Sequence, residues 1–156
     1  MNTLSLSKAE IRELISMRKS LPKNIAVAKD GSVDQQGDGE AAVSFFKKFC
    51  GSRGLSFKDS GMTSIYAFHS INVHIDGVSS IGSLNVLIPL SGKGELGYPH
   101  ETRKRDFSYS RFEKWKISVF DDNKPHAFIS HSKAPCIALI GCVSKKSYNK
   151  FRAQPV

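Results

Sequence analysis

The sequence has few cysteines and no long apolar run. Three cysteines occur among 156 residues, with no Cys-x-x-Cys pair, which argues against a disulfide framework and against a zinc knuckle. The longest apolar run, residues 136–143, is far too short to cross a bilayer. The N-terminus also lacks the pattern of a secretory signal. We therefore expect a cytoplasmic protein with buried thiols and no membrane partner.

Several catalytic motifs are also missing. The sequence contains no glycine-rich phosphate loop after a predicted strand, no Gly-x-Ser-x-Gly elbow and no His-Glu-x-x-His. Each of these motifs places a phosphate, a nucleophile or a zinc ion on a particular turn or helix. Nucleotide-dependent and hydrolytic functions therefore have no support in the sequence.

Acidic residues are few, 14 against 23 lysines and arginines, and the net charge is +9. The basic residues gather at positions 103–105, 111–116 and 145–152. Phe107 and Tyr109 lie among them and could stack on bases while the cations meet phosphates. Their alternate positions also fit the inner face of a strand. The basic surface suits nucleic acid, an acidic protein partner or an anionic small molecule.

Helix signals are confined to the first third of the chain. Ser7 and Glu10 form a capping box, and the apolar stripe that follows predicts a helix over residues 8–19. A second strongly apolar face predicts a helix over residues 40–50. The polar connection between the two helices contains a predicted short strand at 25–27.

From Leu55 onward the pattern changes to short runs of β-branched and aromatic residues between turn residues. The expected strands lie at 55–58, 64–69, 71–76, 83–90, 106–110, 113–120, 125–130 and 136–143. The stretch 92–111, rich in glycine and basic residues, is expected to be a mobile loop at the mouth of a barrel.

Two helices followed by about eight strands predict an α+β, mainly β architecture. The expected fold is a double-stranded β-helix, jelly-roll-like or cupin-like, with two N-terminal supporting helices. At this length we expect a single domain spanning residues 1–156. Its expected parts are a helical support (1–54), a β-barrel core (55–144) and a basic C-terminal tail (145–156).

Two candidate metal ligands lie two residues apart on a predicted strand. Side chains alternate along a strand, so His74 and Asp76 point the same way. His126 on another strand would complete two histidines and one carboxylate, the set that holds non-heme Fe(II) with open positions. Two alternatives remain: His74 as a partly exposed strand histidine, and Asp76 as a turn residue before Gly77.

These residues and their order resemble a known family. His-Ile-Asp-Gly at 74–77 closes a strand, an apolar strand follows at 83–90, and Asp-Asn-Lys-Pro-His at 122–126 opens another. This order resembles the double-stranded β-helix oxygenases that use Fe(II) and 2-oxoglutarate, which include the prolyl and aspartyl/asparaginyl hydroxylases. The resemblance covers roughly residues 64–143. It implies that His74, Asp76 and His126 bind the metal and carry catalysis, and that an unidentified small molecule or protein is hydroxylated.

One part of the family pattern is absent. Members usually carry an arginine about ten residues after the distal histidine, and a serine two residues later, to hold the distal carboxylate of 2-oxoglutarate. Cys136 and Ala138 occupy those positions here, and neither can pair with a carboxylate. The residues expected to bind the co-substrate instead are Tyr66, Asn85, Lys93 and Arg111.

Two functions of other kinds remain open. One is a non-catalytic β-sandwich that binds nucleic acid or an acidic protein through its basic surface. The other is a cupin-like domain with a different metal and chemistry. Binding through phosphate contacts weakens steeply with salt, whereas an iron site would be lost to a chelator at any salt concentration.

Overall fold

The computed structural model describes residues 1–75, 82–100, 102–103 and 106–155. Asp76, a predicted metal ligand, therefore lies outside the described residues. The helices are α1 (Lys8–Lys19), α2 (Gly39–Gly51) and α3 (Lys145–Ala153). The strands are β1 (Val33–Gln36), β2 (Phe57–Lys58), β3 (Ser64–Phe68), β4 (Ile71–His74), β5 (Ser83–Ser91), β6 (Gly94–Pro99), β7 (Phe107–Phe112), β8 (Ser118–Phe120), β9 (His126–Ser130) and β10 (Cys136–Ser144).

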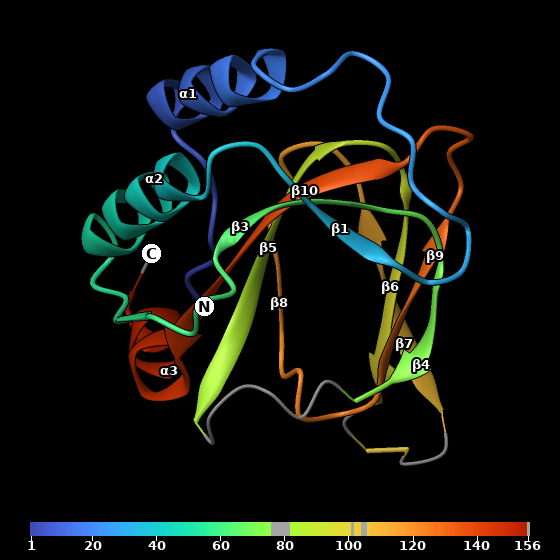
Figure 1. Ribbon diagram of the computed structural model, residues 1–156. Helices are drawn as coiled ribbons and strands as arrows, with labels where there is room; N and C mark the ends of the chain where they lie inside the picture. Colours follow the sequence, from blue (N-terminus) through green and yellow to red (C-terminus); the bar gives the residue numbers. More distant parts are fainter. Residues whose placement is uncertain (76–81, 101, 104–105, 156) are drawn as a thin grey trace.

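The strands form two antiparallel sheets (Figure 1). One sheet has the order β1-β3-β10-β5-β8, with β2 also paired to β10, and the other has the order β4-β9-β6-β7. Within β3 to β10 the chain pairs from the outside inward: β3 with β10, β4 with β9, β5 with β8 and β6 with β7. This nested pairing, rolled into two facing sheets, is a double-stranded β-helix, so the predicted fold class is confirmed.

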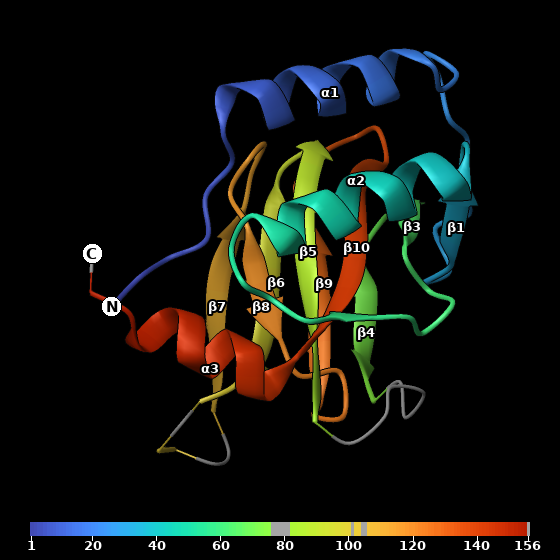
Figure 2. The same ribbon diagram turned by 90° about the vertical axis from the view of Figure 1, so that its left-hand side faces the viewer.

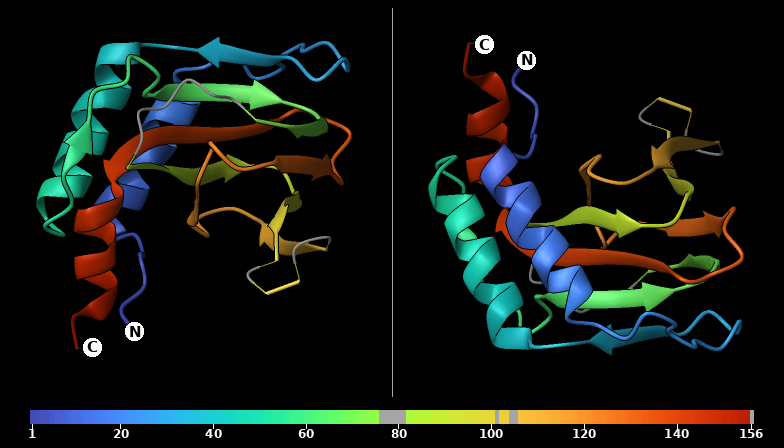
Figure 3. Two further views of the ribbon diagram at one scale, coloured as in Figure 1. Left: turned by 90° about the horizontal axis from the view of Figure 1, so that it is seen from below. Right: turned by 90° about the horizontal axis from the view of Figure 1, so that it is seen from above.

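The three helices lie over the outer face of the first sheet (Figures 2 and 3). Along β10, Ile137, Leu139 and Val143 join the core formed with the helices, while Cys136 and Ala138 join the core between the sheets. Both faces of β5 and β10 are therefore covered, which explains their almost continuous burial. The second core, between the sheets, adjoins the cavity described below.

Helix α1 begins and ends where the sequence predicts. Ser7 and Glu10 make both hydrogen bonds of the capping box, and the helix spans Lys8–Lys19. Glu10 also receives two short hydrogen bonds from the Arg53 guanidinium, with N–O distances of 2.8 and 2.6 Å. Arg53 follows α2, so this ion pair joins the two predicted helices.

Three expectations about the connections are wrong. The N-terminal strand is β1 at 33–36, not 25–27, because its backbone pairs with β3. Most of the described residues in the stretch 92–111 belong to the β6–β7 hairpin rather than to a loop. Of the residues expected as a basic tail (145–156), Lys145–Ala153 form α3, capped by Ser144. In the part of the chain that is described, no helix is long and apolar enough to span a membrane.

The glycines of β6 explain the error at 92–111. A Cβ on Gly94 would clash with the carbonyl oxygen of Ile129, and one on Gly97 would lie 2.8 Å from the Tyr109 ring. Glycine inside a strand often marks such a close approach of a neighbouring chain. Glycines also favour loops, so composition alone could not distinguish a β-hairpin from a loop at 92–111.

Candidate functional site

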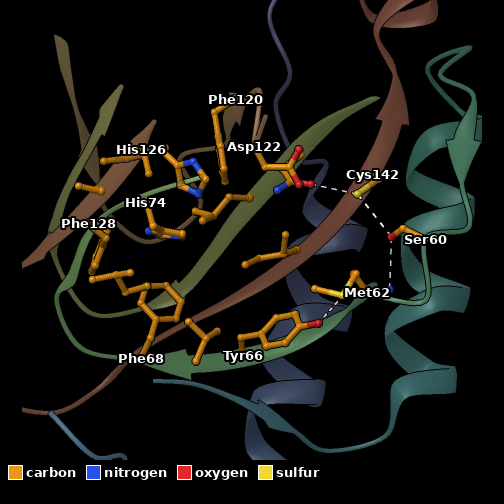
Figure 4. Close-up of a pocket in the computed structure, with 17 residues that line it drawn as sticks. Ser60, Met62, Tyr66, Phe68, His74, Phe120, Asp122, His126, Phe128 and Cys142 are labelled. Atoms are coloured by element: carbon orange, nitrogen blue, oxygen red, sulfur yellow. Dashed lines mark hydrogen bonds between the residues drawn. The ribbon is translucent and has the colours of Figure 1, made fainter. Parts of the chain in front are cut away.

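A cavity of about 260 Å³ lies between the two sheets (Figure 4). Most of its lining is apolar and includes Phe68, Leu87, Leu96, Phe120, Phe128 and Ile140. The polar lining includes Ser60, Tyr66, His74, Asn85, Asp122 and His126. Its volume is just below the usual range of ligand pockets, about 300–1,000 Å³. The cavity therefore suits a small, largely apolar ligand.

The β4–β9 ladder places His74 directly opposite His126. Their ring centroids are 4.3 Å apart with an interplanar angle of 58°. Two imidazoles at this separation can reach one ion, since metal–imidazole bonds are about 2.1 Å long. The structure thus brings together two of the three predicted ligands, which are far apart in sequence.

Backbone carbonyls fix the orientation of both imidazoles. Nδ1 of His74 lies 2.7 Å from the carbonyl oxygen of Asn72, and Nδ1 of His126 lies 2.9 Å from that of Lys124. A carbonyl can only accept a hydrogen bond, so each Nδ1 donates, and in the neutral ring Nε2 carries the lone pair. Metal-binding histidines are commonly held by such a bond from the nitrogen that does not bind the metal.

The surroundings of the two histidines differ. The residue exposure of His126 is 6%, and the Phe120 ring lies 5.1 Å from its ring, centroid to centroid. His74 is only partly buried and ends strand β4, immediately before the segment that contains Asp76. Among the residues that the structure describes, no group of three or more histidine, cysteine, aspartate or glutamate side chains could hold a metal ion. The role of Asp76 therefore stays a prediction.

The side of the cavity away from the histidines carries polar groups that bond to one another (Figure 4). The Tyr66 hydroxyl donates to the carbonyl oxygen of Met62 at 2.5 Å. The Cys142 thiol donates to Oδ1 of Asn85 at 3.0 Å, and the Ser60 hydroxyl donates to Cys142 Sγ at 3.5 Å. Tyr66 and Asn85, two predicted co-substrate residues, thus line the cavity with these bonds already made.

The other two predicted co-substrate residues lie elsewhere. Lys93, in the turn between β5 and β6, and Arg111, on the edge strand β7, are both exposed and do not line the cavity. Among the described lining residues there is no lysine or arginine. Any fixed positive charge in the cavity would have to come from residues that the structure does not describe.

The two positions where the family resemblance places arginine and serine are fully buried. Cys136 and Ala138 have 0% exposure and belong to the core between the sheets. Burial raises the pKa of the Cys136 thiol, although hydrogen bonds with Ser130, Ser132 and the Lys93 backbone oppose that shift. Cys136 is therefore a neutral thiol and cannot replace the missing cation.

Sequence reasoning missed Asp122, whose carboxyl group lines the cavity at 5% residue exposure. Asp122 lies in the turn after β8. Aspartate and asparagine are common in turns for structural reasons, so the local sequence does not single out this residue.

The placement of Phe107 and Tyr109 on an inner face is wrong. On β7 the buried aromatic residue is Phe112, whereas Tyr109 is 54% exposed.

Comparisons with known proteins found similarity to solved structures only. No protein-family model matches the chain, and no curated protein matches it in sequence. The nested strand pairing described above, a double-stranded β-helix, rests on the strand order of this chain itself. Similar solved structures include the Drosophila melanogaster CENP-C cupin domain (TM-score 0.47, 11% identity, 91% of this chain and 84% of that chain). Others are an RmlC-like cupin protein from Desulfovibrio desulfuricans (TM-score 0.40, 13% identity, 93% and 97%) and a predicted oxalate decarboxylase from Thermotoga maritima (TM-score 0.42, 12% identity, 79% and 91%). At these values the similarities carry no conclusion about ligand or activity.

Proposed function

We propose that the protein is an Fe(II)-dependent oxygenase that consumes a 2-oxo acid, with His74, Asp76 and His126 as metal ligands. The observation that supports this most strongly is the cross-strand pair of histidines, each held through Nδ1 by a backbone carbonyl, at the edge of an apolar cavity. This donor set fits iron, because two imidazoles and a carboxylate leave positions open for other ligands.

When bound, the iron supplies oxidative chemistry: a 2-oxo acid, O₂ and a substrate C–H give a carboxylate one carbon shorter, CO₂ and the hydroxylated substrate. The contribution of the chain is binding, orientation and exclusion of water. The Asn72 and Lys124 carbonyls fix the imidazole tautomers. Phe120 packs beside His126, and the apolar lining keeps bulk water from the reacting groups.

The fit to 2-oxoglutarate, the co-substrate implied by the sequence resemblance, is incomplete. Its 2-oxo carboxylate could join the open metal positions. Its distal carboxylate would meet no lysine or arginine among the described residues of the lining. The metal and the co-substrate are therefore tested separately.

The first experiment is anaerobic titration of the metal-stripped protein with Fe(II). We expect stoichiometric binding by the wild type and loss of at least about tenfold in affinity for His74→Ala, Asp76→Ala and His126→Ala. His131→Ala is the matched control, because its imidazole pairs with Glu95 on the surface and lies outside the cavity. Equal iron binding by wild type and His126→Ala would refute the assignment.

One observation favours a second candidate function, nucleic-acid binding on the outer face of the second sheet. Tyr109 is exposed, and Arg111 lies two residues along the same strand, so both share a face. An aromatic ring beside a cation can stack on a base while the cation meets a phosphate. Tyr109→Ala should then weaken binding of a single-stranded oligonucleotide at low salt. Wild-type binding that is absent or independent of salt would exclude this function.

A further inference from the structure

We propose that the cavity takes a 2-oxo acid with an apolar side chain, aliphatic or aromatic, in place of 2-oxoglutarate. The inference rests on the proposed oxygenase function and names the class of its co-substrate. It follows from the charge, the hydrogen bonds and the packing of the cavity away from the histidines.

The described lining of the cavity contains the carboxyl group of Asp122 and no lysine or arginine. The distal carboxylate of 2-oxoglutarate would therefore be buried without a lysine or arginine partner among these residues. Burying an ion without an opposite charge is unfavourable. A hydrocarbon side chain carries no such penalty.

Most hydrogen-bond donors opposite the histidines are already used within the protein: Tyr66 donates to Met62, Ser60 to Cys142, and Cys142 to Oδ1 of Asn85. A distal carboxylate would have to break these bonds or depend on the side-chain amide of Asn85, which also lines the cavity. One neutral amide does not replace the cation that a buried carboxylate needs. An apolar group leaves the existing bonds intact.

Phe68, Leu87, Leu96 and Ile140 supply apolar surface to the cavity. Burying a hydrocarbon group against these side chains is favourable, and the gain grows with each CH₂ group buried. A six-carbon branched 2-oxo acid such as 4-methyl-2-oxopentanoate is therefore a suitable probe.

The test is anaerobic titration of the Fe(II)-loaded protein with 4-methyl-2-oxopentanoate and, separately, with 2-oxoglutarate. Binding is followed by the visible absorption of the iron complex and by the shift in melting temperature. We expect the apolar acid to bind at least about tenfold more tightly. Equal or tighter binding of 2-oxoglutarate would overturn this inference and leave the proposed function standing.

Two variants make the test specific. Ile140→Arg adds a guanidinium to the lining and should shift the preference toward 2-oxoglutarate. Asp122→Asn is nearly isosteric and removes an acidic group from the lining, so it should tighten 2-oxoglutarate binding more than it changes binding of the apolar acid. Weaker 2-oxoglutarate binding by Lys93→Ala or Arg111→Ala would show that an exposed cation serves the site, and would also overturn the inference.

Failure of the proposed function would give a different experimental result from failure of this inference alone. If the wild-type protein binds no Fe(II) before any acid is added, the oxygenase assignment fails and this inference falls with it. If Fe(II) binds and only the preference between acids differs from expectation, the inference alone fails.

Discussion

Gly92 packs directly against Cys136: a Cβ atom on Gly92 would lie 2.6 Å from Cys136 Sγ and 2.9 Å from its Cα. Gly92 also has φ +93°, a conformation that side chains disfavour. The turn that leads from β5 into β6 therefore depends on glycine for two independent reasons. It also closes the space around the position where the family resemblance places an arginine.

Gly92→Ala should destabilise the fold more than Gly31→Ala does. Gly31 has φ +90°, but a Cβ atom there would meet nothing within 4 Å, so its substitution tests backbone strain alone. We expect about 1–2 kcal/mol for that strain and about 1–3 kcal/mol more for the overpacking at Gly92. Urea denaturation of both variants measures the difference. Equal losses would mean that the turn relaxes away from Cys136 at little cost.

The Glu10–Arg53 pair should make stability depend on pH. Burial alone would raise the pKa of Glu10, but hydrogen bonds from Arg53 and Ser7 and the charge of Arg53 hold it below its ordinary value of 4.5. The ionised carboxylate therefore stabilises the fold at neutral pH, and this contribution is lost as the pH falls through the folded-state pKa.

Glu10→Gln should therefore cost about 1 kcal/mol at neutral pH and progressively less as the pH falls below 4.5. Glu13→Gln is the matched control on the same helix, because its pair with Lys48 is largely exposed. Its expected cost is within about 0.5 kcal/mol of zero. A cost for Glu10→Gln that stays constant down to about pH 3 would contradict the linkage.

Gly141 on β10 lies beneath the Phe46 ring of α2, and a Cβ there would come within 2.5 Å of that ring. Gly141→Ala should destabilise by about 1–3 kcal/mol through overpacking. Phe46→Leu removes part of the ring and should relieve that clash. The double variant should then be at least about 0.5 kcal/mol more stable than the sum of the single effects. Strict additivity in denaturation experiments would place the clash elsewhere.

All three cysteines are buried. Burial raises the pKa of Cys50 to about 12, against the opposing charge of Arg53. It also raises the pKa of Cys142, where a hydrogen bond from Ser60 opposes the shift and Asp122 adds to it. The native protein should therefore react very slowly with a thiol reagent, and the three thiols should react rapidly in urea. Rapid labelling of the native protein would show that the core opens readily.

Much of the fold could be predicted from sequence because its signals are local. The Ser7–Glu10 capping box defines α1, and the runs of β-branched residues define β5 and β10. Strand β1 could not be found in this way, because the polar sequence Val-Asp-Gln-Gln is extended only through its pairing with β3. Helix α3 did have a signal, Ser144 before an amphipathic segment, which the high density of positive charge obscured.

The candidate site also has one part that local sequence signals predict and another that depends on long-range strand pairing. Alternation along strands predicts that His74 presents one face, and the pattern of a strand-opening histidine singles out His126. The position of His74 directly opposite His126 depends on the long-range pairing of β4 with β9. The apolar character of the cavity and the inclusion of Asp122 arise from strands that are distant in sequence, so neither could be read from a local motif.

The register of His74 with His126 also has a mechanical consequence. Strand β4 is a short strand at the edge of its sheet, whereas β9 is paired on both sides. An edge strand with few ladder bonds opens more easily than an interior one. Any ion shared by the two imidazoles would cross-link this edge strand to an interior strand of the same sheet. Amide hydrogen exchange in β4 would therefore slow on loading, and would report occupancy of the site even when no turnover can be measured.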